Sequence, residues 1–244
     1  MAEITAQVGS SISALTQEFS IVTNNMANVS TAGFKRRCTD FVKSLMELQN
    51  QTGQEQTGTV DLKSAIDFSQ GAMTQTGQSL DFSIFGKGFF TIETPEGQRY
   101  TRDGVFHLNS SGQIVDSSER IVAGQAGPIT IPASSSLSEL SVSGDGTISA
   151  GGSAVGKFQI ADFGDNEGKL VPSGFNCFTM PDENIKPAAA ANASVRQGYQ
   201  ESSNVRIVDE LVDMIMVTRL YEANMKLVGA QTEAAKNILS VAAG

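Results

Sequence analysis

Few residues of this 244-residue chain are of the types that carry out acid–base, nucleophilic or metal chemistry. His107 is the single histidine, and Cys38 and Cys177 are the two cysteines. A catalytic triad needs a nucleophile, a base and an orienting group, and a zinc site needs several Cys or His ligands at short spacing. The sequence therefore predicts no enzyme, no metal site and no cofactor. We expect His107 to face solvent on a hairpin and both cysteines to be ordinary thiols.

Three short motifs resemble ligand sites only in part. Gly86-Lys87-Gly88 lacks the spacing of a phosphate loop and predicts a break between two strands. The acidic run at 162–168 lacks the ligand order of a calcium loop and predicts a solvated loop. Lys35-Arg36-Arg37 could meet an acidic partner or lipid head groups, but three cations at a helix C-terminus are explained more simply by the helix dipole.

Charge and hydropathy exclude further classes of protein. The formal net charge is −9, so the chain lacks the basic surface of a nucleic-acid binder. No apolar stretch is long enough to cross a membrane. The N-terminus has neither the basic nor the apolar region of a secretory signal, so we expect no cleaved signal peptide.

The N-terminal residues 1–34 predict a helix with one apolar seam. The positions that step by four and three are Val8, Ile12, Leu15, Phe19, Val22, Met26 and Val29. This 3.5-residue spacing is typical of a coiled coil. Glu3 and Glu18 are the only charges in this segment, which suits a helix packed among others, because buried charges are costly to desolvate.

The C-terminal residues 199–244 predict a longer helix of about 35 residues. Its seam begins with Ile207, Leu211 and Met214 and continues at the same spacing. The apolar surface is wider than one partner helix would cover, since Val208, Val212, Ile215 and Leu220 lie outside the seam. The nearest partner within the chain is the N-terminal helix, and the remaining apolar width indicates contacts with other chains.

Residues 76–198 predict a β-rich domain, because short β-prone runs alternate with turn dipeptides such as Glu96-Gly97, Asp103-Gly104 and Asp145-Gly146. Residues 35–75 are interpreted as an extended arm. The predicted fold class is therefore α+β, with N- and C-terminal helices paired as a coiled coil and an inserted, mainly antiparallel β-domain.

Three stretches together resemble the flagellar rod and hook protein family. They are the run 24–35 (NNMANVSTAGFK), the run 80–106 with its LDFSIFGKGFF and YTRDGVF segments, and the run 198–205 (GYQESSNV). Within them, the signature positions are Thr31, Gly33, Phe34, Asp81, Gly86, Gly88, Arg102, Asp103, Gly104, Glu201, Ser203, Asn204 and Val205. Ser83, Gln200 and Thr218 depart from the usual residues of the family.

The resemblance implies a structural subunit of the flagellar basal-body rod, which polymerises through its terminal helices and transmits torque from motor to hook. Its implied partners are copies of itself, other proximal, distal and rod-base subunits, and the flagellar type III export apparatus, with no nucleic acid and no membrane insertion. Its implied location is the rod in the periplasmic space. The segments 127–132 and 145–149 resemble the proximal rod protein.

Other interpretations remain open. A distal rod or hook-type subunit would share the terminal helices, although a hook subunit should carry a larger insert. A glycan-binding β-module would bind sugar without polymerising, and a cell-wall enzyme would need a catalytic pair that the sequence does not offer.

The helical pattern also predicts specific contacts. Within the chain, the two helices are expected to meet at Val22, Met26, Met214, Tyr221 and Met225. Contacts between subunits are expected at Asn24, Asn25, Asn28, Val208, Val212, Ile215 and Leu220. For the three asparagines, local capping of the helix C-terminus is the alternative.

Overall fold

The computed structural model describes residues 2–39, 64–190 and 192–242, which form two compact units. The helical unit contains residues 2–27, 37–39, 64–67 and 205–242 of this set. The β unit contains residues 28–36, 68–190 and 192–204. The α+β class and the mainly antiparallel β-domain predicted from the sequence are confirmed.

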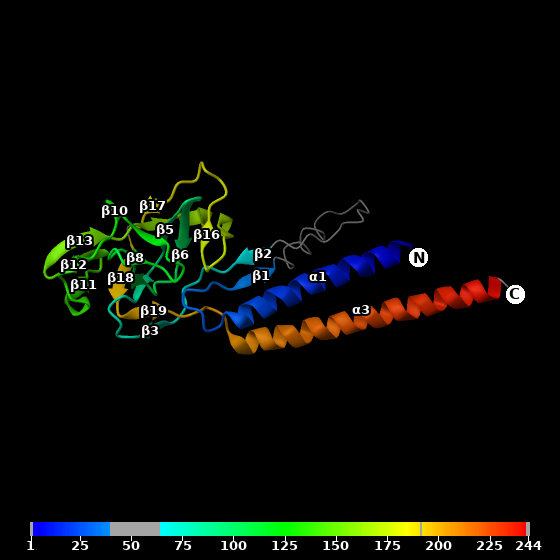
Figure 1. Ribbon diagram of the computed structural model, residues 1–244. Helices are drawn as coiled ribbons and strands as arrows, with labels where there is room; N and C mark the ends of the chain where they lie inside the picture. The colour runs from blue at the N-terminus through cyan, green and yellow to red at the C-terminus, as the bar shows by residue number, and fades with distance from the viewer. Residues whose placement is uncertain (1, 40–63, 191, 243–244) are drawn as a thin grey trace. The chain divides into compact units, whose positions relative to one another are not determined.

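The helical unit is built on two long helices, α1 (Ala2–Ala27) and α3 (Ile207–Ala242). They pack against each other and run in opposite directions, because Asn25 near the end of α1 contacts Glu210 near the start of α3. Figure 1 shows α1 in blue beside α3 in orange and red, with the two chain termini at the same end. Both segments are free of proline, as a long helix requires.

Both helices are shorter than the predicted segments, residues 1–34 and 199–244. α1 ends at Ala27 rather than near residue 34, and the following residues form turns in which the Thr31 amide donates to the Asn28 carbonyl. α3 begins at Ile207, where Asp209 and Glu210 supply negative charge to the first turn. The start of α3 coincides with the first position of the predicted seam, whereas the seam of the N-terminal helix continues past Ala27 to Val29.

The predicted arm contains three short strands. In the helical unit, β1 (Arg37–Thr39) pairs antiparallel with β2 (Ser64–Ile66). In the β unit, β3 (Met73–Gln75) pairs antiparallel with β19 (Tyr199–Glu201), which lies just before α3 in the chain. The middle of the arm, residues 40–63, lies outside the described residues.

The β unit consists of antiparallel sheets. The largest has the strand order β15-β16-β6-β5-β9-β8-β7, with β10, β14 and β17 joined at its sides. A three-stranded sheet has the order β11-β12-β13, and β18 pairs with β4. The bounds are β4 Phe82–Phe85, β5 Phe89–Thr94, β6 Gly97–Thr101, β7 His107–Leu108, β8 Ile114–Val115, β9 Ile121–Gly124, β10 Gly127–Pro128, β11 Leu140–Val142, β12 Thr147–Ala150, β13 Ser153–Lys157, β14 Ile160–Asp162, β15 Val171–Pro172, β16 Phe178–Thr179, β17 Ala188–Ala189 and β18 Ser194–Gln197, with short 3-10 helices at Leu137–Glu139 and Gly164–Lys169.

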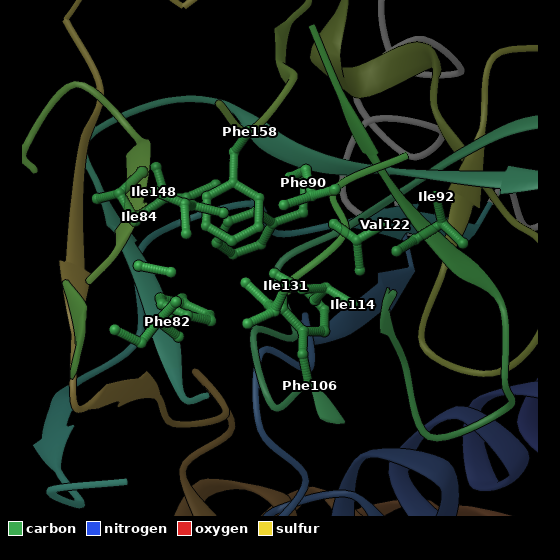
Figure 2. Packing of buried hydrophobic residues seen from close by; sticks show 14 of the residues in the cluster. Phe82, Ile84, Phe90, Ile92, Phe106, Ile114, Val122, Ile131, Ile148 and Phe158 are labelled. Atoms are coloured by element: carbon green, nitrogen blue, oxygen red, sulfur yellow. The ribbon is translucent and has the colours of Figure 1, made fainter. Parts of the chain in front are cut away.

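The core of the β unit is aromatic and aliphatic. Phe90 and Phe158 lie edge to face with centroids 5.3 Å apart, and Phe90 and Phe106 do so at 5.2 Å. Figure 2 shows these rings gathered with the side chains of Ile114 and Val122. Edge-to-face rings add stabilisation beyond the apolar area that they bury, so this cluster gives the β unit a core of its own.

Two of the predicted turns are confirmed and one has a different role. Glu96 lies in the turn between β5 and β6, with Gly97 as the first residue of β6, and Asp145-Gly146 lies in the connection between β11 and β12. Gly104 connects no hairpin. A Cβ at Gly104 would lie 1.8 Å from the Phe82 carbonyl oxygen, so a close approach of two backbones requires glycine there.

Candidate functional site

Residues from the three signature stretches meet in a buried ion network of the β unit. Lys35 Nζ lies 2.5 Å from Glu201 Oε1, and Arg102 Nη1 lies 3.3 Å from Glu201 Oε2. The side chains of Lys35 and Glu201 are 0% exposed and that of Arg102 is 3% exposed. Lys35 and Glu201 are 166 positions apart in the sequence. The network therefore joins the segment that follows α1, the segment that precedes α3 and the β-domain between them.

Backbone groups complete the network. Lys35 Nζ donates to the Ser69 carbonyl at 2.7 Å, and the Gly71 amide donates to Glu201 Oε1 at 3.0 Å. Arg102 Nη2 donates to the Gly86 carbonyl at 2.9 Å. Buried charges are tolerated when they are paired and hydrogen-bonded. These bonds supply most of that compensation, while the buried Arg102 Nε has no hydrogen-bond partner among the described residues.

The electrostatics of the network follow from its burial. Desolvation lowers the pKa of both Lys35 and Arg102, and the charge of Glu201 opposes that shift. Two cations share one carboxylate, so removal of Glu201 would leave two buried charges without their common partner.

Gly33 fixes the N-terminal segment against the β-domain. Its φ of +64° is a left-handed conformation, and a Cβ there would lie 2.3 Å from the Arg102 carbonyl carbon. The Gly33 amide also donates to the Glu201 carbonyl at 2.7 Å. Only glycine meets both requirements. Gly33 thus has a packing role, six residues after α1 ends.

The segments that enter and leave the β unit lie side by side next to the network. The Arg36 amide donates to Asn204 Oδ1 at 2.7 Å, and the Asn204 amide donates to the Phe34 carbonyl at 3.4 Å. Phe34 and Val205 are buried. The N- and C-terminal signatures are therefore one structural feature, because each supplies hydrogen-bond partners for the other.

The remaining signature residues support turns and strand contacts. Thr31 Oγ1 donates to Asn28 Oδ1 at 3.1 Å, and Asp81 forms a β-bridge with Val105. Gly86 and Gly88 have positive φ in the predicted break between β4 and β5, and Ser203 lies half-buried beside Asn204. These residues stabilise turns and strand contacts within the β unit.

Among the signature residues, Asp103 has a carboxyl group whose pKa is clearly raised. Burial raises its pKa to about 6, and the charges of Asp116 and Asp81 add to the rise, while a hydrogen bond from the Val105 amide opposes it. That bond joins the amide to Asp103 Oδ1 at 3.0 Å.

A second buried polar cluster, which the sequence analysis did not identify, lies in the helical unit. Asn25 Nδ2 donates to Glu210 Oε2 at 3.1 Å and to the Arg37 carbonyl at 2.8 Å, while its Oδ1 accepts from the Arg37 amide at 2.9 Å. Asn25 and Glu210 are 0% exposed. Asn25 thus bonds within its own chain, which differs from the predicted contact between subunits. The sequence next to Asn25 gave no indication of these hydrogen bonds, because the partners Arg37 and Glu210 come from other segments of the chain.

The predicted seam between the helices is only partly buried in the single chain. Val22 is buried and Met26 and Met214 are half-buried, but Tyr221 is 40% exposed and Met225 is 47% exposed. α3 buries Glu210 and Val217 instead. Along α3, the predicted seam is thus more buried at Met214, close to Glu210, than at Tyr221 and Met225 farther along the helix.

The residues predicted to contact other subunits otherwise lie at or near the surface. Val208 is 68% exposed and Ile215 is 60% exposed, and Val212 and Leu220 are exposed as well. Asn24 and Asn28 are half-buried. The α3 face thus carries a run of apolar side chains that the single chain does not cover.

The side chains considered above for acid–base or nucleophilic chemistry lie on the surface or in the packed interior. His107 Nε2 lies 2.9 Å from Glu119 Oε1 on the surface, and burial raises the pKa of the Cys177 thiol. Across the described ranges, no cluster of three His, Cys, Asp or Glu side chains could hold a metal ion. Within the same ranges, no helix is both long and apolar enough to span a membrane.

Comparison with known proteins identifies the family in which these signature residues occur. The family model of the flagellar hook protein FlgE/F/G D1 domain matches residues 83–150, and that of the flagellar basal body rod FlgEFG protein C-terminal region matches residues 196–241. The flagellar basal-body rod protein FlgF of Caulobacter vibrioides is 33% identical over 91% of each chain. The chain belongs to the flagellar basal-body rod protein family.

Both named types of rod protein occur among the relatives. FlgG of Caulobacter vibrioides is 34% identical over 85% of this chain and 87% of the relative. FlgG of Buchnera aphidicola is 32% identical over the same shares. As a member of the rod family, the chain is a structural protein and not an enzyme.

Proposed function

We propose that this rod-family protein is an axial subunit of the flagellar basal-body rod that transmits torque from motor to hook. It polymerises through α1 and α3 with copies of itself and with other proximal, distal and rod-base subunits. The observation that carries this proposal is the uncovered apolar face of α3. Large exposed apolar surfaces mark sites of protein association, and the exposed members on α3 are Ile207, Val208, Leu211, Val212, Ile215, Met216, Leu220, Tyr221, Met225 and Leu227.

In the assembled rod, α1 and α3 pair as a coiled coil through Val22, Met26 and Met214. Tyr221 and Met225 then join Val208, Val212, Ile215 and Leu220 in contacts with neighbouring subunits, and Asn24 and Asn28 supply hydrogen bonds. A helical tube packed in this way resists twisting, because close-packed interiors have few voids and low compressibility.

We further propose that the subunit is of the proximal, FlgF type and lies in the rod within the periplasmic space. The match to FlgF of Caulobacter vibrioides over 91% of each chain supports this assignment, as do the segments 127–132 and 145–149. The subunit is exported by the flagellar type III apparatus.

Charged substitutions on α3 test the proposal. Val212→Asp combined with Ile215→Asp places two carboxylates on the exposed apolar face, and we expect loss of the protein from isolated basal bodies together with loss of motility. Lys226→Asp, on an exposed and already charged position of the same helix, should leave both unchanged. Incorporation of the double variant at the wild-type level would contradict polymerisation through α3. Immunogold labelling of the basal bodies gives the position along the rod.

A further inference from the structure

The hairpin of β15 and β16 presents an exposed aromatic side chain at its tip. Phe175 is 77% exposed, more than any other large apolar side chain of the described residues. Gly174, Phe175 and Asn176 have φ values of 78°, 48° and 55°. A left-handed conformation is unfavourable for a bulky residue, so this backbone persists only if its surroundings hold it.

Side chains from separate segments hold the tip. Thr101 Oγ1 donates to the Asn176 carbonyl at 2.9 Å, and Asn176 Nδ2 donates to the Ala32 carbonyl at 2.7 Å. Arg99 Nη1 donates to the Ser173 carbonyl at 3.2 Å. The hairpin itself closes through a bond from the Cys177 amide to the Gly174 carbonyl at 2.9 Å. The tip is thus a fixed platform.

Arg120 orients the ring from the side. Its guanidinium carbon lies 5.3 Å from the centroid of Phe175, a cation–π contact. Its Nη2 atom pairs with Asp116 Oδ2 at 2.5 Å, which anchors the guanidinium. Phe175 therefore projects from a rigid base with a cation next to it, and a preordered aromatic of this kind costs little entropy on binding.

The hairpin is poorly suited to pairing with another strand. β15 is an edge strand of the largest sheet, but it has two residues and one of them is Pro172, which has no amide hydrogen to donate. A partner would therefore contact the side chain of Phe175 and the neighbouring exposed Val171 and Pro172.

A receiving surface exists in the helical unit. A groove of about 450 Å³ between α1 and α3 is lined by the apolar side chains of Ala14, Leu15, Val217 and Leu220, with the carboxylates of Glu18 and Asp213 also on its walls. Its volume lies in the range of pockets that bury a compact group, and its apolar walls suit an aromatic ring.

We propose that Phe175 of one copy inserts into this groove of a second copy, an inference that rests on the proposed assembly function. In a helical array each subunit presents one surface to a different surface of the next, so a projecting group and a recess on the same chain can propagate the contact. Phe175 and Arg120 supply the projection, and the groove supplies the recess.

Photo-crosslinking in intact basal bodies tests the contact directly. Phe175 is replaced by photoreactive p-benzoylphenylalanine in cells that express isotopically heavy and light copies, and crosslinked peptides are mapped by mass spectrometry. We expect mixed heavy–light crosslinks to α1 or α3 near Leu15, Val217 and Leu220. Crosslinks only within one copy, only to another protein, or none at all would overturn the inference.

A substitution at the tip separates assembly from stability. Phe175→Asn suits a left-handed residue better, so we expect no decrease in the unfolding temperature, whereas incorporation into rods should fall about tenfold or more. Leu137→Asn, at another exposed apolar position of the β unit, should leave incorporation unchanged. Normal incorporation of Phe175→Asn would overturn this inference alone, and absence of the wild-type chain from rods would overturn the proposed function itself.

Discussion

Glu201 is the residue on which the buried network depends. One carboxylate oxygen accepts from Lys35 and the Gly71 amide, and the other pairs with Arg102. Replacing one member of a buried ion pair is costly, because its partners stay buried without compensation. Its backbone carbonyl also accepts from the Gly33 amide, so the residue connects both ends of the β unit.

Glu201→Gln removes the charge while keeping the shape of the side chain. We expect the β unit to lose about 3–5 kcal/mol of unfolding free energy, measured by urea denaturation followed by circular dichroism. Glu96→Gln, which breaks the exposed pair with Arg99, should have little effect. Equal stability of the two variants would contradict a structural role for the network.

Asp103 predicts a pH dependence. Its pKa is raised from 3.8 to about 6, so between these values the folded state binds more protons than the unfolded state. Stability from this group is therefore greatest below about pH 4 and decreases as pH rises to 6, by about 1–3 kcal/mol.

Asp103→Asn tests whether Asp103 lowers the stability as pH rises. Asparagine can still accept from the Val105 amide but carries no charge, so the variant should be more stable than the wild type at pH 7 and the difference should vanish near pH 4. Denaturation midpoints of both proteins from pH 4 to pH 7 provide the measurement. A constant difference across this range would exclude Asp103 as the titrating group.

At the scale of elements, Asn25 fixes the register of α1 against α3 and β1. Its amide satisfies both backbone groups of Arg37 and contacts the buried Glu210. Apolar stripes permit several rotations of one helix against another, and a buried polar contact selects one of them.

Asn25→Ala should loosen this arrangement. Loss of the amide leaves buried partners without their hydrogen bonds, at a cost of about 1–3 kcal/mol to the helical unit. Hydrogen exchange should increase at β1 and in the first turns of α3. Asn224→Ala is a suitable control, because the Asn224 amide donates to the Leu220 carbonyl of its own helix. Unchanged exchange in Asn25→Ala would argue against a register-setting role.

At the scale of the molecule, each unit is assembled from segments far apart in the sequence. The β unit includes residues 28–36, which follow α1, and it has its own aromatic core. The helical unit depends on α1 and α3 together, since a single helix with one apolar side cannot offset its ordering entropy.

Deletion of residues 207–244 should therefore disrupt the helical unit and leave the β unit folded. We expect the β unit to stay folded, with its strand signal and a cooperative unfolding transition retained, while α1 loses protection from hydrogen exchange and the cells lose motility. Unfolding of the whole chain after this deletion would show that the β unit depends on α3.

Much of the fold was accessible from local patterns. The apolar spacing identified α1 and α3, the turn dipeptides identified the β-domain, and the absence of a second histidine or a cysteine cluster excluded common catalytic sites. The start of α3 at Ile207 coincides with the first position of the predicted seam. The end of α1 at Ala27 was not accessible, because the apolar spacing continues to Val29, which belongs to the β unit.

The amino-acid sequence by itself determined the class of the fold, the order of its elements and membership of the family, since periodicity and short motifs are local properties of the chain. Only the tertiary structure decided that Lys35, Arg102 and Glu201 form one buried network, that Asn25 bonds to Glu210, and that Phe175 stands exposed on a strained turn. Charge pairing, burial and backbone strain depend on which distant segments come together, and no local pattern records that.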